Sequence, residues 1–278
     1  HVLHRGEVNQ RGDSVRPGTI PLFAKEKWEF DLPEVHEEGE RRAALAEWIV
    51  REDHSLTWRA IVNRVWQWHF GQPIVGTPND FGPLGQLPTH PELLDWLAVY
   101  FRDSGGSFKK LHKLLVMSET YRQSSLEDEK KSKIDSGNQW LWRMNRRKLS
   151  AEEVRDSVLS VSGQLNLEMG GPGFYLFKLE HTAHSPHYYY HKFDPDDKKS
   201  HRRSIYRFVV RSQPNPFMTT LDCADSSQST PRRNETLTAL QALSLLNNKF
   251  TLVMSQHFAD RLAQGGKGSG YQIKAGFE

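Results

Sequence analysis

The sequence contains very few of the residues that build disulfides, zinc sites or membrane spans. Cys223 is the only cysteine among 278 residues, which excludes an internal disulfide and a zinc site made of several cysteines. A lone cysteine is typically a small buried apolar side chain. Every apolar run is interrupted before the roughly 18 residues that a membrane-spanning helix needs. We therefore expect no membrane span. The net charge of +3 is small, so we expect no nucleic-acid partner either.

Catalytic signature motifs are also missing from the sequence. It has no Gly-x-Ser-x-Gly elbow, phosphate-binding P-loop, dinucleotide fingerprint or Cys-x-x-Cys-His haem attachment motif. We therefore expect no cofactor in this chain. Asp222, Asp225 and His90 are the weak candidates for general acid–base chemistry. Two aspartates in one loop are a pattern of low specificity, so the sequence leaves open whether the protein is an enzyme.

Tryptophan and histidine divide the chain unevenly. All eight tryptophans lie between Trp28 and Trp142, whereas five of the thirteen histidines lie between His181 and His201. With the turn and charge pattern, this predicts a mainly α fold, with an extended N-terminal arm and a small β element. The expected parts are an arm at 1–40, a Trp-rich helical region at 41–125, a charged loop at 126–137 and a second helical region at 138–278. A short strand is expected at 204–210, and the whole is interpreted as one compact domain cut from a longer polypeptide.

Capping signals mark several expected helix ends. Thr89 with Glu92 and Ser150 with Glu153 have the spacing of capping boxes, which satisfy free backbone N–H groups of a first helical turn. Gly71 is expected to end the helix that precedes it. A break at Asn247–Asn248 is expected to divide two successive helices in the C-terminal region.

A histidine-rich segment is the weak candidate for a metal site. His181, His184, His187 and His191 recur at intervals of three and four residues, which on a helix would bring imidazoles to one face. Pro186 and three consecutive tyrosines make a continuous helix improbable on this segment. An exposed aromatic loop is therefore the favoured interpretation, and no metal is expected.

Arginine is concentrated in the second half of the chain, and two interpretations remain open. In the first, the arginines pair with internal carboxylates, with Asp222 and Arg233 as expected partners and Thr236 or Asn234 capping the next helix. In the second, several guanidinium groups face a cleft and hold an anionic ligand, because arginine forms bidentate pairs with carboxylate, sulfate and phosphate.

Several long blocks of this sequence occur in a recognisable order. They include "VNRVWQWHFG", "TPNDFG", "HPELLDWLA", "YRQSS" and "LQALSLLNN". Together they resemble the planctomycete PSD-type domain, domain of unknown function 1553, from about residue 3 to 263. The segment 181–191 and Arg11 depart from the family's usual pattern.

The resemblance implies a setting more than an activity. Such domains are C-terminal modules of exported, cytochrome c-associated proteins, so we expect an extracytoplasmic location, in the periplasm, on the cell surface or secreted. Haem c is expected only in an adjacent N-terminal module, and the N-terminal modules of the same polypeptide are the expected partners. A polysaccharide or protein partner is a further expectation.

The resemblance marks polar positions in this chain that match the family's motifs, but it implies no catalytic residues. The ligand-binding candidates are Arg203, Arg233, Tyr121, Arg122, Asn63 and Arg64. For the last four, buried hydrogen bonding between helices is the alternative role. Two functions remain open: an accessory, assembly or binding domain, and a carbohydrate-active enzyme domain that acts on anionic, for example sulfated, polysaccharide with acid–base carboxylates and arginine clamps.

Overall fold

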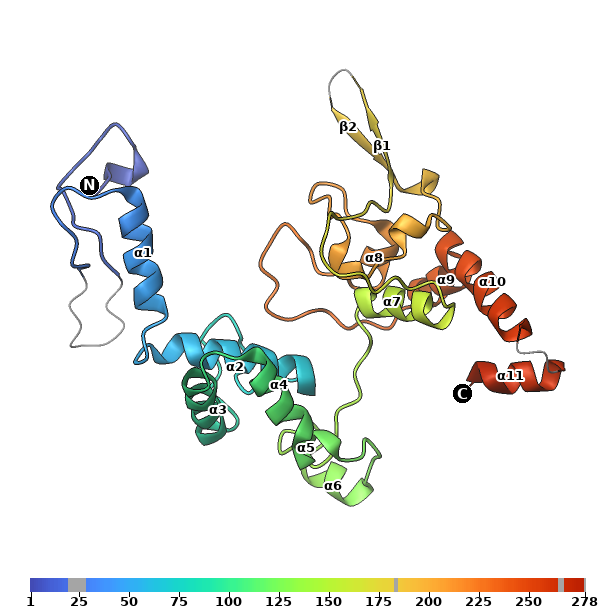
Figure 1. Ribbon diagram of the computed structural model, residues 1–278. Coiled ribbons are helices and arrows are strands. Elements are labelled where there is room, and N and C mark those ends of the chain that lie inside the picture. Colours follow the sequence, from blue (N-terminus) through green and yellow to red (C-terminus); the bar gives the residue numbers. More distant parts are fainter. Residues whose placement is uncertain (20–28, 183–184, 265–267, 278) are drawn as a thin grey trace. The chain divides into compact units, whose positions relative to one another are not determined.

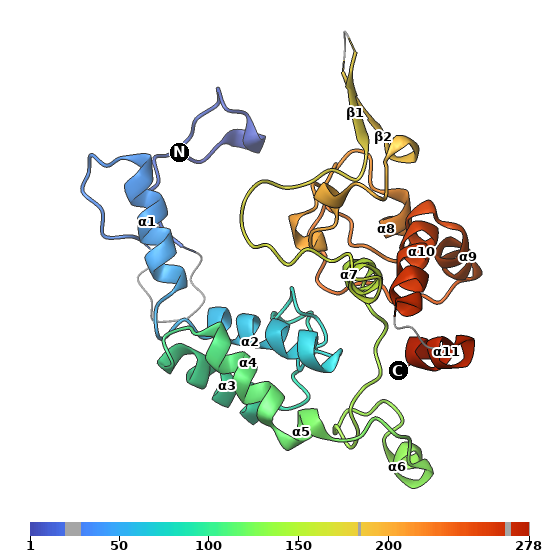
Figure 2. The same ribbon diagram turned by 45° about the vertical axis from the view of Figure 1, so that its right-hand side comes forward.

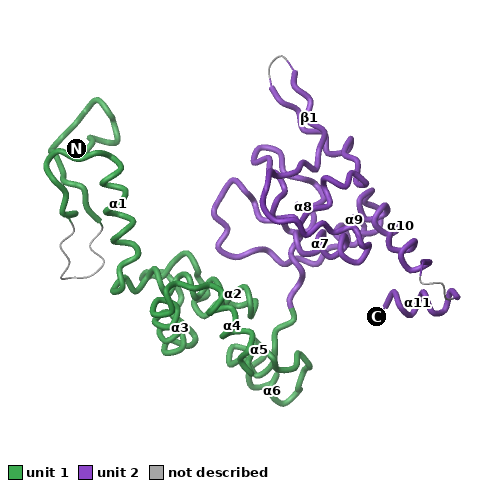
Figure 3. The backbone as a smooth tube through the Cα atoms, in the orientation of Figure 1, with its two compact units in different colours: residues 1–146 green, residues 147–278 purple. Residues whose placement is uncertain are grey.

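The chain divides into two compact units, residues 1–146 and 147–278 (Figure 3). The computed structural model describes residues 1–19, 29–182, 185–264 and 268–277. Within these residues the fold is mainly helical, with one two-stranded antiparallel sheet. This confirms the expected fold class. No helix in the described ranges is long and apolar enough to cross a membrane.

Unit 1 begins with a segment that contains only a 3-10 turn at His4–Gly6 and two isolated bridges, Leu3 to Arg11 and Gly18 to Glu29, among its described residues before Glu38. Its helices then follow in chain order (Figure 1): α1 Glu38–Ile49, α2 Ser55–Phe70, α3 Pro91–Asp103, α4 Phe108–Met117, α5 Glu119–Arg122 and α6 Glu129–Ile134.

The core of unit 1 lies where α2, α3 and α4 pack together. Val62, Val65, Leu97, Phe101 and Leu111 are each at most 2% exposed. Their spacing of three and four residues within α2 and α3 places them on one face of each helix. Gly71 ends α2 at a φ of 78°, a left-handed conformation that glycine adopts without steric cost.

Two local expectations for unit 1 are wrong. The N-cap of α3 is His90 rather than Thr89, with Pro91 as the first helical residue, so no capping box forms there. Thr89 instead donates its hydroxyl to the Ile74 carbonyl. The charged segment 126–137 is not all loop, because Asp128 caps the short helix α6 by accepting from two backbone N–H groups.

Unit 2 combines short helices with one hairpin. Its elements are α7 Ala151–Val161, β1 Lys178–His181, β2 Pro186–Tyr189, α8 Pro216–Thr220, α9 Ala239–Asn247, α10 Lys249–Ala263 and α11 Ser269–Phe277, with 3-10 turns at Tyr190–Lys192, Lys198–Ser200 and Ser204–Tyr206. Strand β1 pairs antiparallel with β2, with Lys178 opposite Tyr189. The hairpin projects from the rest of unit 2 in both ribbon views (Figures 1 and 2).

The core of unit 2 is built on α7. Leu159 packs with Phe250 and Met254 of α10, and Ala151 packs with Met218 and Leu221 at α8. Ser150 and Glu153 form the predicted capping box at the start of α7. The helix break at Asn247–Asn248 is also confirmed, because Asn248 ends α9 and caps α10.

The expected strand at 204–210 is wrong. Ser204–Tyr206 is a 3-10 turn, and the chain beyond it makes only an isolated parallel bridge between Phe174 and Arg207. The Ser204 N–H and hydroxyl both donate to the carboxylate of Asp156 on α7. These bonds hold the turn against the helix. From the end of the turn onward, Phe174 N donates to the Tyr206 carbonyl and Phe208 N donates to the Phe174 carbonyl, a single bridge that does not extend into a sheet among the described residues.

Candidate functional site

Asp222 is the most heavily bonded of the predicted catalytic residues. It follows α8 with a φ of 65°, and its carboxylate accepts from Lys148 Nζ at 2.7 Å, Thr236 N at 2.8 Å and Gln241 Nε2 at 3.0 Å. Burial by itself raises the pKa of Asp222, but these hydrogen bonds outweigh it and lower the pKa to about 2. Asp222 is therefore ionised at neutral pH and joins three segments of unit 2.

The predicted pair between Asp222 and Arg233 does not form. Arg233 donates instead to Glu152 of α7, with an Nη1 to Oε2 distance of 2.6 Å. The predicted caps are also wrong: Thr238 caps α9 in a capping box with Gln241, whereas the Thr236 hydroxyl bonds to Asp222.

Glu152 is the centre of a second polar cluster. The hydrogen bond from Arg233 and other polar contacts overcome the effect of burial and lower the pKa of Glu152. The thiol of Cys223 lies 3.5 Å from Glu152 Oε1. Burial and the charge of Glu152 raise the pKa of Cys223, so this thiol is a poor nucleophile at neutral pH. The cluster borders a cleft of about 660 Å³, which Glu152, Glu153, Asp156, Arg207 and Arg233 help to line.

Asp225 does not join either cluster. Its side chain accepts from the Ser227 backbone N–H at 2.9 Å and from Gln228 Nε2 at 3.3 Å. The backbone bond from Ser227 lowers the pKa of Asp225. Asp225 thus belongs to an exposed local turn and is not hydrogen-bonded to another carboxylate among the described residues.

The remaining arginine candidate in unit 2, Arg203, is half-buried. Its guanidinium carbon lies 5.7 Å from the ring centroid of Tyr206. No hydrogen bond in the described structure joins Arg203 to a carboxylate. The structure thus places Arg203, Arg233 and Asp222 in three different local environments.

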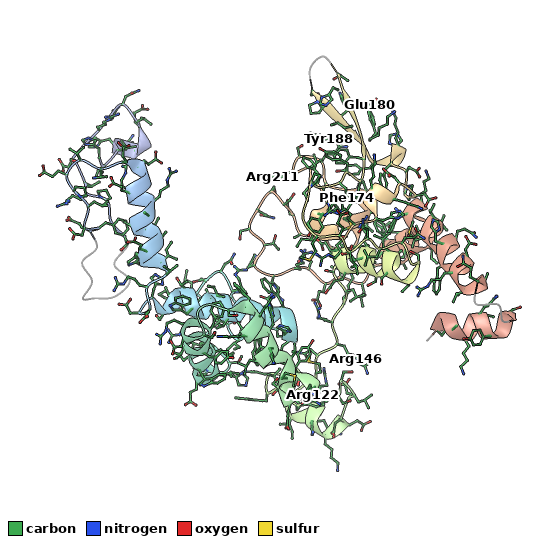
Figure 4. The ribbon with its side chains drawn as sticks, in the orientation of Figure 1. Arg122, Arg146, Phe174, Glu180, Tyr188 and Arg211 are labelled. Carbon is green, nitrogen blue, oxygen red and sulfur yellow. The ribbon has the colours of Figure 1, made fainter. Side chains whose placement is uncertain are left out.

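Two other arginines, Arg155 and Arg202, fix the loops of unit 2. Arg155 is 2% exposed and donates to the carbonyls of Ser200 at 2.5 Å and Arg202 at 3.0 Å, and to the Ser204 hydroxyl at 3.2 Å. Burial lowers the pKa of Arg155 to about 10, and Asp156 opposes this effect only in part. Its guanidinium also lies 5.0 Å from the ring centroid of Phe174, which Figure 4 shows in the interior of unit 2.

Arg202 fixes a neighbouring glycine-rich loop. It is 8% exposed and donates to the carbonyls of Glu168, Gly170 and Pro172. Buried arginine bonded to several backbone carbonyls organises chain segments and is not available to clamp a ligand. No residue pattern marks this role in the sequence, because the guanidinium partners are backbone atoms.

The candidates in unit 1 serve local packing. Asn63 is fully buried and exchanges two hydrogen bonds with the backbone of Val75, at 3.1 and 2.9 Å. Tyr121 packs edge-on against Phe70, with a centroid distance of 5.8 Å. Arg64 donates to Asn79 Oδ1.

His90 and Arg122 complete the candidates in unit 1. The ring of His90 packs edge-on against Trp140, with a centroid distance of 5.3 Å, and its Nδ1 lies 2.9 Å from the Thr89 hydroxyl. Arg122 is exposed at the end of α5 (Figure 4).

The histidines do not form a metal centre in the part of the chain that the structure describes. No group of three His, Cys, Asp or Glu side chains in the described ranges could hold an ion. His181 and His187 lie on the hairpin strands and His191 on the following 3-10 turn, where rings contact tyrosines: His187 stacks on Tyr189 with a centroid distance of 6.0 Å. The prediction for His184 lies outside the described residues.

The comparisons with known proteins identify a family without an assigned activity. The family model PSD1, described as "Protein of unknown function (DUF1553)", matches residues 41–278. Residues 3–40, which the sequence resemblance included, lie outside this match. No curated protein and no solved structure matches the chain.

Proposed function

The chain belongs to the family of proteins of unknown function DUF1553, and from this premise we propose that it is an accessory domain that binds or assembles and does not catalyse. The observation that supports this most directly is the environment of Asp222. Its carboxylate accepts from Lys148, Thr236 and Gln241 and has a pKa of about 2. A general acid or base works best with a pKa near the working pH, and Asp222 is far from that range.

We further propose that the domain is part of a large exported, planctomycete-type protein linked to cytochrome c. The family resemblance is the support for this setting. One cysteine cannot form a Cys-x-x-Cys-His motif, so in this proposal haem c is held by an adjacent N-terminal module, which is also the first partner of the domain. Fractionation of cells that express the full-length protein, followed by haem staining, tests the proposal; cytoplasmic, haem-free protein would contradict it.

A carbohydrate-active enzyme is the alternative, and one observation favours it. Glu152, Glu153 and Asp156 line the same cleft of about 660 Å³ as Arg207 and Arg233. Each of these carboxylates already accepts hydrogen bonds from protein groups: Glu152 from Arg233, Glu153 from Arg147, and Asp156 from Ser204. Such pairing stabilises the ionised forms and disfavours proton donation.

The two functions differ in turnover. The 278-residue chain is incubated with sulfated, uronate-containing and neutral polysaccharides, and new reducing ends are measured. We expect none above a heat-denatured control. Release of reducing ends that Glu152→Gln or Asp222→Asn abolishes, while the variant remains folded by circular dichroism, would establish the enzyme and refute the accessory role.

A further inference from the structure

A groove of about 810 Å³ opens in unit 2, and it shares no lining residue with the cleft beside Glu152. Its lining comes from two segments, 166–178 and 192–202, and we name it the loop groove. Asn166 N donates to the His201 carbonyl, which joins the two segments directly. Phe174 N donates to the carbonyl of Tyr206, which follows the second segment.

The loop groove is held in place by buried polar groups. Arg202 binds three carbonyls of the glycine-rich loop 168–172. Gly170 and Gly171 of this loop have φ values of 79° and 75°, which L-residues with a Cβ rarely adopt. On the second segment, the buried His201 ring bonds to the Pro195 carbonyl at 2.9 Å. Loops fixed in this way need little reorganisation when they bind a ligand.

The charge of the loop groove favours a ligand that carries anionic groups. Lys198 and Lys199 lie on the 3-10 turn Lys198–Ser200, and no described side chain forms an ion pair with either ammonium group. Lys178 and Lys192, which also line the groove, share Glu180 of the hairpin (Figure 4), at 3.5 and 3.0 Å. Unpaired ammonium groups beside a groove attract anions and position them there.

Carboxylates line the same groove and narrow the ligand class. Asp194 and Asp197 each use one oxygen, Oδ1, to accept a backbone N–H, from Asp196 and Lys199 respectively. Their second oxygens accept no hydrogen bond from the described residues, so they are available for hydroxyl donors of a ligand. A nucleic acid carries a charge on every phosphate, which these carboxylates would repel. A polymer of sugar rings with anionic groups satisfies both sets of groups, because its charges can pair with the lysines and its ring hydroxyls can donate to the carboxylates, whereas the sugars within a DNA chain have no free hydroxyl.

An aromatic ring supplies a flat contact surface in the groove. Tyr175 is 50% exposed, while its ring packs in a tilted arrangement against Phe208 and Phe177, with centroid distances of 5.0 and 5.2 Å. Tyrosine offers a large amphipathic contact area at low cost in conformational entropy. A half-exposed ring that its neighbours hold can receive the C–H face of a sugar ring.

We propose that the loop groove binds an acidic polysaccharide. A sugar ring stacks on Tyr175, uronate or sulfate groups pair with Lys198 and Lys199, and ring hydroxyls donate to Asp194 and Asp197. The proposal deepens the accessory function proposed above and rests on it. Carboxylate and sulfate share the recognition chemistry, so the choice between them is decided by experiment.

Affinity gel electrophoresis of the 278-residue chain tests this binding. Gels contain polygalacturonate as the carboxylate probe, dextran sulfate as the sulfate probe or dextran as the neutral probe. We expect retardation by at least one acidic polymer and none by dextran. Lys198→Gln with Lys199→Gln should weaken this binding at least fivefold, and Tyr175→Ala at least tenfold.

Matched controls separate the groove from general surface effects. Lys130→Gln with Lys131→Gln removes the same charge from exposed positions on α6, and Tyr271→Ala removes a ring that is 48% exposed on α11. Both controls should bind like the wild type. Equal loss in controls and groove variants, or no retardation by either acidic polymer, would overturn the proposal.

A single-stranded oligothymidylate and a reducing-end assay complete the experiment. Binding of the oligonucleotide as tightly as the acidic polysaccharides, with the same loss in the lysine variant, would replace polysaccharide by nucleic acid as the occupant. Reducing ends measured in the same samples keep the two proposals distinct. Binding without turnover supports the accessory role and the polysaccharide groove. Turnover refutes the accessory role. If neither binding nor turnover is seen, only the proposal for the groove is refuted.

Discussion

Replacing Asp222 by asparagine should destabilise unit 2 without disturbing the backbone. Asp222 has a φ of 65°, and asparagine tolerates this left-handed conformation better than most other residues. The substitution keeps one oxygen that can accept from Thr236 or Gln241. It removes the negative charge that faces Lys148 at 2.7 Å. The measured change therefore reports the charge and its hydrogen bonds.

The expected magnitude follows from the pKa of Asp222. Its fall from 3.8 to about 2 corresponds to about 2 kcal/mol at roughly 1.36 kcal/mol per pKa unit. The side chains of Lys148 and Asp222 are 20% and 15% exposed, so solvent screens part of the interaction, and we expect about 1 to 2 kcal/mol of lost unfolding free energy. Urea unfolding followed by far-ultraviolet circular dichroism measures it. Tryptophan fluorescence cannot, because all eight tryptophans lie between residues 28 and 142, in unit 1.

Hydrogen exchange and pH give two independent checks. The Thr236 backbone N–H, which donates to Asp222, should exchange roughly tenfold faster in Asp222→Asn for each ~1.4 kcal/mol lost. Because the pKa of Asp222 is lower in the folded than in the unfolded protein, its stabilisation is complete well above pH 3.8 and is lost as the pH falls through about 2. A difference from wild type below about 0.5 kcal/mol at pH 7, the range of unrelated surface substitutions, would refute this reasoning. So would a difference that is as large at pH 2.

Three further perturbations test other parts of the structure. Arg155→Lys removes the guanidinium group that donates to the Ser200 and Arg202 carbonyls. We expect a loss of about 3 kcal/mol in unfolding free energy, measured by circular dichroism, as for other broken buried charge networks. A loss under half of that would contradict the role of Arg155 in fixing these loops. Asn63→Ala leaves the buried N–H and C=O of Val75 unpaired, so tryptophan fluorescence in urea should show unit 1 destabilised by about 2 to 3 kcal/mol, and an unchanged transition would contradict it. The raised pKa of Cys223 predicts alkylation by iodoacetamide at pH 8 at least about tenfold slower in the folded chain than in urea, whereas equal rates would show an exposed, reactive thiol.

The capping signals show which local features could be predicted from sequence. Ser150 and Glu153 were correctly predicted as a capping box, because that motif depends only on residues three positions apart. The same spacing led to a wrong prediction of a capping box at Thr89 and Glu92. Pro91 has the fixed φ of a first helical residue, so the helix starts one position later than predicted. Local patterns fail where a neighbouring residue with a stronger conformational preference competes.

The polar contacts between distant segments could not be predicted in the same way. The sequence offered Arg233 as the partner of Asp222 because both lie in one loop, but Lys148 lies 74 positions away and takes that place. Arg233 reaches Glu152 over 81 positions. Arg155 and Arg202 bind backbone carbonyls, an acceptor that every residue carries, so no residue pattern marks these sites.

By itself the sequence determined the helical class of the protein and helix ends such as those at Gly71, Ser150 and Asn247–Asn248, because helix formation and capping depend on residues only a few positions apart. It also determined the family, through long blocks of residues in a fixed order. Only the tertiary structure decided which charges meet and where a groove opens. Those features depend on segments distant in sequence, such as 166–178 and 192–202, that together line one groove. The hydrogen-bond acceptors between such segments are often backbone carbonyls, as for Arg202.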